Sequence, residues 1–363
     1  SLSYEEFQNA HEGSASKRAE PLLDSVINPL YQAFDILLKG RAHREPLELF
    51  VPEKKINLDE RGNVTSITNR VSIPAHKLVE EFMIQANVAA AEELETKNTP
   101  CMYRIHEQPS FDKLENLRQF MQSLDYNIAK GQVIKPKFFN NLMSKVAGTP
   151  HENVVSTIVL RTQMQAKYSP DNHGHFGLSL TRYGHFTSPI RRYADVLVHR
   201  ALIKALKLGS DGLSKYDIEN LFETAEHIST TERNSMIAER SSTERYLAHY
   251  MSNKIDEEFE GKINGVIRAG LFVSLVETGG EGFIPISSIV GDYFHHDKDH
   301  QLLQGEHSGL IYQLGDSITV KLKEANPISG GLIFQLIDDK LNKRESPRKH
   351  LKNSRRPRKR NRK

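Results

Sequence analysis

Two adjacent arginines follow a proline in the stretch HFTSPIRRYADVLVHRAL, residues 185–202. Proline is favoured in the first turn of a helix, so we expect a helix to open at Pro189 with Arg191 and Arg192 in its first turn. Free backbone N–H groups and the positive end of the helix dipole lie there, and the planar guanidinium group suits a phosphate. The sequence therefore predicts a phosphate contact at Arg191. A structural ion pair with Asp195 is the alternative, which we assign to Arg192.

Three histidines, His173, His175 and His185, precede these arginines and raise the question of a metal site. An alternating His-x-His on a strand places both rings on one face, which zinc would accept. No further ligand follows at a usual spacing, so we predict no metal ligation here. Ser188 is not predicted to be a nucleophile either, because no Ser-His-Asp order is readable and Pro189 follows it directly.

A pair of carboxylates, Glu80 and Glu81, lies in the helical pattern AHKLVEEFMIQANVAAAEELE, residues 75–95. The apolar stripe of this helix is predicted to be Leu78, Phe82, Ala86 and Ala89, so the two glutamates flank the buried face. Surface solvation would explain the pair equally well.

The elements that must position these residues are mostly helical up to about residue 251 and mostly extended afterwards. Helices are expected over 22–40 with an interruption at Pro29, over 75–95, 111–124, 136–146 and 151–168, and as two helices within 217–251, the second opened by the capping-box pair Ser229 and Glu232. Strands are expected over 46–52 and 62–71, around the turn 59–63, and over 175–180.

From about residue 259 the apolar period becomes two, and glycines mark the corners of five short strands. This pattern predicts a small closed barrel whose first strands bend at Gly265 and Gly270. On it, Phe272 and Phe283 are candidate platforms for base stacking, as are Tyr293 and Phe294 in a following loop.

Three cations of this region, Lys262, Arg268 and Lys321, are candidates to follow a phosphate backbone. The structural alternative is that each aromatic residue merely belongs to the barrel core.

The charge of the chain is unevenly distributed. Residues 341–363 carry 12 Lys or Arg against one Glu, which leaves a net charge of −8 for the preceding 340 residues of a chain whose formal net charge is +3. Such a run cannot order itself by apolar burial, so we expect a disordered tail with affinity for polyanions; a solubilising or targeting tail is the alternative.

The single cysteine, Cys101, excludes an intramolecular disulfide, which fits a cytoplasmic location. No apolar run is long enough to span a membrane, so we expect no membrane association.

Together with YSPDNHGHFGLSL, MYRIHEQPS and TERNSMIAER, the arginine motif resembles the ribonuclease II / ribonuclease R family of processive 3′-to-5′ exoribonucleases. The barrel, with GLFVSL and GFIPISSI, resembles the S1-type OB-fold RNA-binding domain, and the basic tail is more typical of the ribonuclease R branch. The resemblance implies that single-stranded RNA is the substrate, and that the tail contacts the ribosome or structured RNA.

Individual roles also follow from the resemblance. It implies that Arg191 holds the phosphate at the scissile end, that Glu239 assists catalysis, and that Glu80 and Glu81 line an RNA channel. His185, Ser188 and Arg192 then belong to the RNA-binding loop. Lys262, Arg268, Phe272, Phe283 and Lys321 form the RNA-binding set of the barrel.

The resemblance further implies Mg²⁺ held by clustered aspartates, because hydrolysis needs hard oxygen ligands to activate water. In the family this cluster lies on the N-terminal side of SYEEFQNAHEG, where this chain begins, and the only Asp-Asp pair here, Asp338–Asp339, lacks the rest of the motif. The chain is therefore expected to be a fragment of a hydrolytic exoribonuclease that is inactive alone, or a complete non-hydrolytic RNA-binding protein. The absence of an initial methionine favours the fragment.

The fold class expected overall is α+β. We predict a helix-rich partial catalytic domain over residues 1–252, a five-stranded OB-fold barrel over 257–339, and a disordered basic tail over 340–363.

Overall fold

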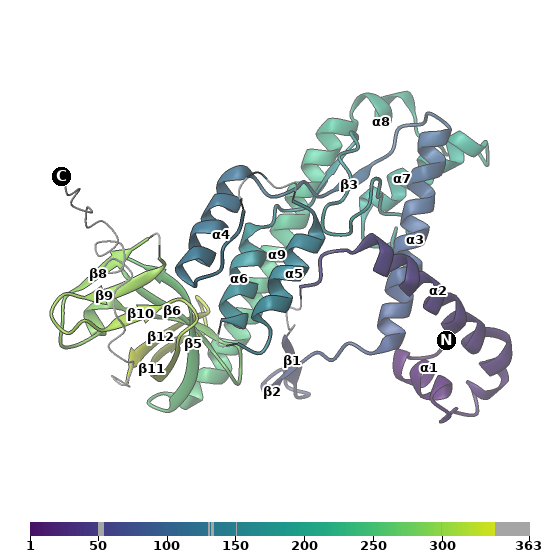
Figure 1. Cartoon of the computed structure of the whole chain (residues 1–363). Helices are drawn as coiled ribbons and strands as arrows, with labels where there is room; N and C mark the ends of the chain where they lie inside the picture. The colour runs from purple at the N-terminus through teal and green to yellow at the C-terminus, as the bar shows by residue number, and fades with distance from the viewer. Residues whose placement is uncertain (50–53, 130, 132–133, 150, 299, 338–363) are drawn as a thin grey trace, which may run out of the picture.

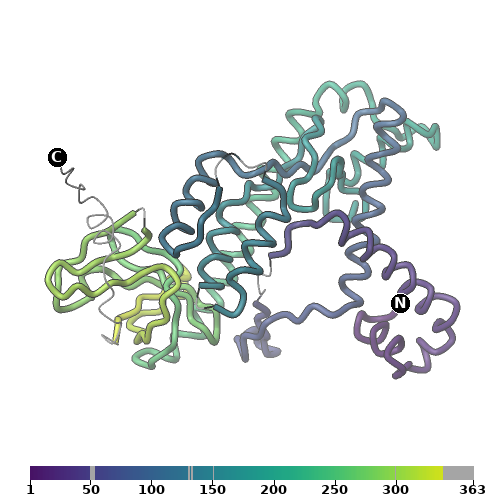
Figure 2. The backbone as a smooth tube through the Cα atoms, viewed as in Figure 1, coloured from purple at the N-terminus to yellow at the C-terminus, as the bar shows by residue number. Residues whose placement is uncertain are grey.

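The computed structural model describes residues 1–49, 54–129, 131, 134–149, 151–298 and 300–337. A helix-rich region precedes a closed five-stranded barrel (Figure 1), which confirms the predicted α+β class. The first helices and the barrel lie at opposite ends of the molecule (Figure 2). The basic tail and the Asp338–Asp339 pair lie outside the described residues. Within the described ranges, no helix is long and apolar enough to cross a membrane.

The helices of the first region are α1 (Tyr4–His11), α2 (Asn28–Arg44), α3 (Pro74–Thr96), α4 (Phe111–Ser123), α5 (Pro136–Val146), α6 (Glu152–Thr162), α7 (Tyr193–Leu206), α8 (Lys215–Glu219) and α9 (Leu221–Met251). Two antiparallel pairs connect them, β1 (Lys54–Leu58) with β2 (Val64–Asn69) and β3 (Tyr103–Ile105) with β4 (Lys167–Ser169). A π-helical turn at Leu23–Ile27 precedes α2, and Pro29 stands in the first turn of α2, which confirms the predicted interruption.

The buried face of α3 differs from the predicted stripe. Its members mostly recur every three or four residues and include two polar side chains; they are Ala75, Leu78, Glu81, Ile84, Asn87, Ala90, Ala91 and Leu94. Glu81 therefore lies in the buried face rather than beside it, while Ala89 is exposed. The prediction failed because it counted only apolar residues, whereas partners from other elements satisfy these two polar groups.

One long helix, α9, replaces the two helices expected around Ser229 and Glu232. Ser229 is inside α9, where its Oγ donates to the carbonyl of Ala225 at 2.7 Å and accepts from the backbone N–H of Tyr168 at 3.0 Å. The side chain thus serves strand β4 instead of capping a helix. A capping box does occur earlier, between Ser214 and Asp217 at the start of α8.

The strand predicted over 175–180 is wrong, and residues 46–49 of the strand predicted over 46–52 are not extended into a strand, whereas 50–52 lie outside the described residues. The turn at residues 59–63 is confirmed, with the N–H of Gly62 donating to Asp59, and the described strand before it is β1 from Lys54. A hairpin partner must directly precede the turn, so the residues next to it form the strand. At 175–180 the chain reverses instead of extending, because His175 and Leu180 exchange backbone hydrogen bonds of 2.8 and 3.2 Å.

The predicted five-stranded barrel is confirmed, and it closes in the order β11-β12-β7-β6-β5. Its strands are β5 (Glu258–Ile267), β6 (Gly270–Leu275), β7 (Glu281–Pro285), β11 (Ser317–Asn326) and β12 (Gly331–Leu336). The pairing of β5 with β6 shifts register between Ile263 and Gly265, and Gly270 has φ +151 with Ile284 O so close that a Cβ there would clash. Both glycines therefore mark the expected bends.

A second, three-stranded sheet is inserted before β11 and was not predicted. It consists of β8 (Phe294–Asp297), β9 (Leu302–Gly305) and β10 (Ile311–Gln313) in antiparallel order. Phe294 is 6% exposed, and its ring centroid lies 5.5 Å from that of Tyr312. Phe294 is therefore a core residue and not a stacking platform, whereas Tyr293 is exposed.

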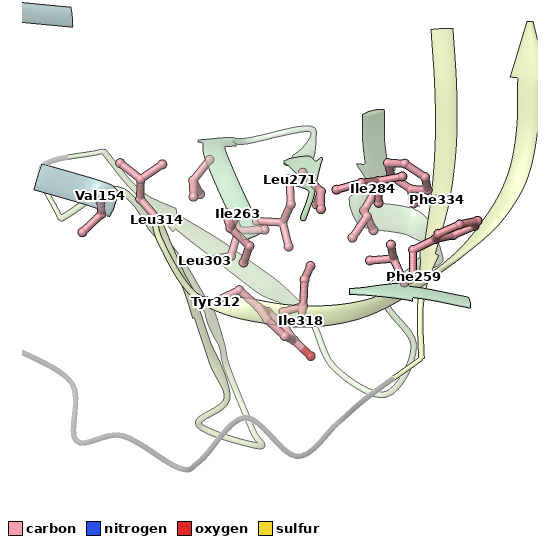
Figure 3. Packing of buried hydrophobic residues seen from close by; sticks show 14 of the residues in the cluster. Val154, Phe259, Ile263, Leu271, Ile284, Leu303, Tyr312, Leu314, Ile318 and Phe334 are labelled. Atoms are coloured by element: carbon pink, nitrogen blue, oxygen red, sulfur yellow. The ribbon is translucent and has the colours of Figure 1, made fainter. Parts of the chain in front are cut away.

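The helices α4, α5 and α6 and the end of α9 share one hydrophobic core with the barrel. Val154 of α6 and Met251 of α9 belong to the same buried cluster as Ile263 and Phe334 (Figure 3). Gly315 lies so close to Val154 that a Cβ on the glycine would be 2.7 Å from the valine Cβ. The barrel is thus packed directly on the helical region.

Candidate functional site

The turn formed by Ser188–Arg192 lies directly before α7, which begins at Tyr193 rather than at Pro189 as predicted. The carboxylate of Asp195 accepts the backbone N–H of Ser188 at 2.7 Å, and the carbonyl of Ser188 accepts the N–H groups of Arg191 and Arg192 at 3.3 and 3.2 Å. These bonds keep the backbone of Arg192 extended, with φ −128 and ψ 118, so the first helical residue is Tyr193, directly after it. Asp195 therefore fixes the shape of the turn.

The two arginines of the turn have different surroundings. Arg192 holds the fully buried Asp195 in a bidentate pair, with 2.8 Å from Nε to Oδ2 and 2.9 Å from the terminal nitrogen to Oδ1. This confirms the structural role assigned to Arg192. Arg191 is exposed, and its guanidinium group has no hydrogen-bond or ion-pair partner among the described residues. Its charge is free to meet an external anion.

His185 lies behind this turn and is neutral. Its Nδ1 lies 2.8 Å from the hydroxyl of Tyr168. Burial, followed by the positive charges of Arg192 and Arg104, lowers the pKa of His185 to about 2. Burial raises the pKa of Tyr168 to about 12, so the pair exchanges no charge near neutral pH. His185 therefore acts on the turn as an uncharged hydrogen-bonding group.

Residues from distant segments complete the support of this turn, and most of them carry no recognisable signal in the sequence. Arg104 of β3 lies 4.7 Å above the Tyr168 ring and pairs with Glu232 of α9 at 2.6 Å. Glu232 was interpreted only as a helix cap, and a single charged residue on a short strand such as Arg104 carries no spacing signal.

Asn87 of α3 supports the same loop from the other side. Its Nδ2 donates to the hydroxyl of Tyr183 at 2.9 Å, and its Oδ1 accepts the backbone N–H of Phe186 at 2.9 Å. Asn87 is 2% exposed, and its position in the buried stripe of α3 is the signal that would have identified it.

The three candidate glutamates do not lie together in one cluster. Glu80 is exposed, whereas Glu81 is 2% exposed and pairs with Arg41 at 2.5 Å and with Arg44 at 3.6 Å. Glu81 thus ties α3 to α2, which limits its access to RNA. The Glu239 carboxylate has no partner among the described residues and lies in a stretch of α9 that is exposed on all sides.

On the barrel, Phe272 and Phe283 form one platform. They are paired across β6 and β7, their ring centroids lie 5.1 Å apart, and Phe272 is 41% exposed. Arg268 is exposed nearby in the connection between β5 and β6. The pair offers flat apolar surface to a nucleic acid base.

The other two candidate cations of the barrel are partly buried or paired with a carboxylate. Lys262 is half-buried on β5, and the Lys321 ammonium lies 3.7 Å from the Asp256 carboxylate. The assignment of these residues to RNA binding stays a prediction.

The described residues form no cluster of potential metal ligands. Among them, no three His, Cys, Asp or Glu side chains converge as a metal site would require. His173 is exposed, and the Nδ1 of His175 accepts the backbone N–H of Leu178 at 3.1 Å. We therefore derive no chemical step through a metal from these residues.

Comparison with known families gives two matches. A family model described as RNB domain matches residues 1–208, and one described as S1 RNA binding domain matches residues 252–336.

Curated relatives carry the name ribonuclease R. That of Aquifex aeolicus is 37% identical over 92% of this chain and 47% of its own length, and that of Vibrio cholerae is 35% identical over 86% and 39%. The chain spans less than half the length of these relatives. The structure also matches that of Mycoplasma genitalium RNase R in complex with ribose-methylated single-stranded RNA, with a TM-score of 0.85 and 26% identity, over 93% of this chain and 53% of that one.

Proposed function

Because the chain belongs to the RNB-domain family that includes ribonuclease R, we propose that it is part of a processive 3′-to-5′ exoribonuclease that hydrolyses single-stranded RNA to 5′-nucleotides. In this proposal residues 1–252 are the carboxy-terminal part of the catalytic domain, 257–339 are the RNA-binding barrel, and 340–363 are a basic tail. The observation that carries the proposal is the exposed and unpaired Arg191 beside the fully paired Arg192.

In this proposal, the described residues of the chain mainly bind and position the RNA. Asp195 and Arg192 hold the turn, and the Arg191 guanidinium group takes one phosphate near the reacting end. A positioned cation of this kind stabilises charge that develops on the phosphate in the transition state. Glu239 assists proton transfer in this proposal. The Phe272 and Phe283 rings stack on bases further upstream in the RNA strand.

The Mg²⁺ that this chemistry uses is proposed to bind to aspartates outside the described residues. Once bound, such an ion would activate water and stabilise the leaving oxygen. The partners proposed for the tail are the ribosome or structured RNA.

The alternative is a non-catalytic RNA-binding protein, and one assay separates the two. The purified 363-residue chain is expected to bind a labelled single-stranded oligonucleotide without dependence on Mg²⁺ or Mn²⁺, and to release no nucleotides. Adding a segment that bears the family's aspartate cluster should restore 3′-to-5′ degradation. Processive, EDTA-sensitive degradation by the chain alone would show that its own residues bind the metal. Failure of the supplemented protein to degrade RNA would favour the non-catalytic alternative.

A further inference from the structure

A second positively charged site lies away from Arg191, where α4 and α6 meet the inserted sheet of the barrel. A cavity of about 360 Å³ opens there between the two helices and the connection from β8 to β9. Its lining residues are Lys113, Asn116, Leu117, Gln119 and Phe120 of α4, Ile158, Arg161 and Thr162 of α6, and Lys298 and Gln301 of the connection. In Figure 1, α4 and α6 lie beside the barrel and α7 lies on the far side of the helical region. We call this cavity the junction pocket.

The three cations of the junction pocket come from three separate segments. The Lys113 ammonium donates to the carbonyl of Gln163 at 2.6 Å, and the Arg161 guanidinium donates to the carbonyl of Asn264 at 2.7 Å. Lys298 is exposed at the rim. Because both partners are neutral carbonyls, the bonds orient the side chains without neutralising their charge. Each group also keeps further N–H donors for a ligand.

Other cations in the molecule show a different arrangement. Arg41, Arg104, Arg192 and Arg200 each lie within 2.9 Å of a carboxylate oxygen. None of the described residues that line the junction pocket is acidic. The pocket therefore keeps a positive potential, which an anion would relieve.

The rest of the lining suits a phosphate that is attached to a nucleoside. Leu117 and Phe120 are buried and form an apolar floor together with the half-buried Ile158. Asn116 and Gln119 carry amide groups at the exposed rim. The volume falls near the lower end of the ~300–1,000 Å³ that is usual for pockets binding small ligands, so it admits one unit of a chain rather than a folded partner. An exposed rim lets a continuous strand enter and leave.

We propose that the junction pocket binds a phosphate of the RNA backbone as a contact separate from the one at Arg191. The inference rests on the RNA-binding function proposed above and adds a surface on α4 and α6 to the path of the strand. Since the arginine and the two lysines address phosphate, recognition at this position is independent of base sequence.

The test compares the RNA affinity and its salt dependence for the whole chain and for two variants. Lys113→Gln/Lys298→Gln removes two cations, and Lys298→Gln alone removes the exposed one, whose ammonium has no partner among the described residues. Lys215→Gln is the matched control, because this lysine is 90% exposed on α8 and distant from the pocket in sequence and fold. Lys298→Arg keeps the charge and is expected to retain wild-type affinity.

For the double variant we expect single-stranded RNA affinity to fall about 3- to 10-fold near 0.1 M salt. The slope of log K against log salt should decrease by about 0.7, the value for one phosphate contact on a single strand. A mononucleotide and inorganic phosphate, used as separate titrants, should lose less affinity in the variant than the oligonucleotide does, because each lacks the other contacts of the strand.

Wild-type affinity and slope in the double variant would overturn the proposal while leaving RNA binding by the chain intact. A loss confined to the mononucleotide or to inorganic phosphate would also overturn it, since the pocket would then hold a free phosphate. If the wild-type chain binds no RNA at all, the proposed function fails and this inference fails with it. Thermal unfolding of each variant verifies that the fold is retained.

Discussion

At the scale of single residues, the 188–192 turn assigns opposite tasks to neighbouring arginines. Arg192 is held by Asp195, which also holds the backbone of Ser188, so one buried carboxylate fixes both the turn and its ion pair. Arg191 is left with a free guanidinium group on a constrained backbone. Such preorganisation reduces the conformational cost of placing a charge at one point of a substrate.

Replacing Arg191 is expected to affect turnover more than binding. In the complete enzyme, Arg191→Ala should lower the rate of nucleotide release by about 10²–10³, because the group acts on charge that develops at one phosphate while the barrel supplies most of the affinity. Arg191→Lys should restore little, since lysine lacks the planar fork. Single-turnover kinetics with a parallel binding titration measures both quantities. Normal turnover with lost affinity would make Arg191 a general RNA contact.

His185 is expected to make the stability of the fold depend on pH. Its pKa is lowered to about 2 in the folded chain, mainly by burial, whereas an unfolded histidine titrates near 6.5. The unfolded state therefore binds more protons in between, so its contribution to stability is complete above about pH 6.5 and is lost as the pH falls. The slope from one such histidine is at most about 1.4 kcal/mol per pH unit.

Urea unfolding between pH 7 and pH 5 measures this slope. His185→Gln should reduce it, whereas the control His227→Gln, which changes an exposed histidine of α9, should leave it unchanged. Equal slopes for wild type and His185→Gln would contradict the neutral buried state.

At the scale of elements, the side chain of Ser229 links α9 to β4. Ser229→Ala would leave the backbone N–H of Tyr168 without its acceptor in a buried place, which is expected to cost about 1–3 kcal/mol of unfolding free energy. Ser242→Ala, at an exposed position of the same helix, should change it by less than about 0.5 kcal/mol. Chemical denaturation of both variants decides the matter, and equal stabilities would show that Ser229 provides no support to β4.

The elements that could be predicted from the sequence are those whose signals are local. The barrel follows from alternating apolar residues and from glycines at its bends, and the interruption at Pro29 follows from the missing N–H of proline. The failures at Ser229 and at Glu81 share one cause, because each side chain depends on a partner from a distant segment. At 175–180 the cause is local, since His175 and Leu180 exchange backbone hydrogen bonds. Arg104 was missed because only the assembled fold brings it to the loop before α7, whereas Asn87 was missed because the stripe of α3 was read from apolar residues alone.

At the scale of the whole molecule, the positive charges fall into two groups. The described part of the chain pairs many of its arginines internally, while the 23 residues from 341 onward concentrate 12 Lys or Arg in a segment that lies outside the described residues. Removing residues 341–363 is expected to weaken single-stranded RNA binding and to flatten its salt dependence by several counterions. Filter-binding titrations over a range of salt concentrations test this, and an unchanged affinity and slope would show that the tail does not contact RNA.

The unbroken course of α9 sets a spacing in the molecule. Glu232 pairs with Arg104 beneath the loop before α7, and Arg240 reaches Glu281 on the barrel strand that carries Phe283. These two positions are eight residues apart on one continuous helix, a rise of about 12 Å. The helix α9 thus sets the distance between the loop before α7 and the barrel. An RNA strand must exceed a minimum length to contact both the loop and the barrel, so we expect oligonucleotides below that length to dissociate faster than longer ones, which dissociation rates over a series of oligonucleotide lengths would measure.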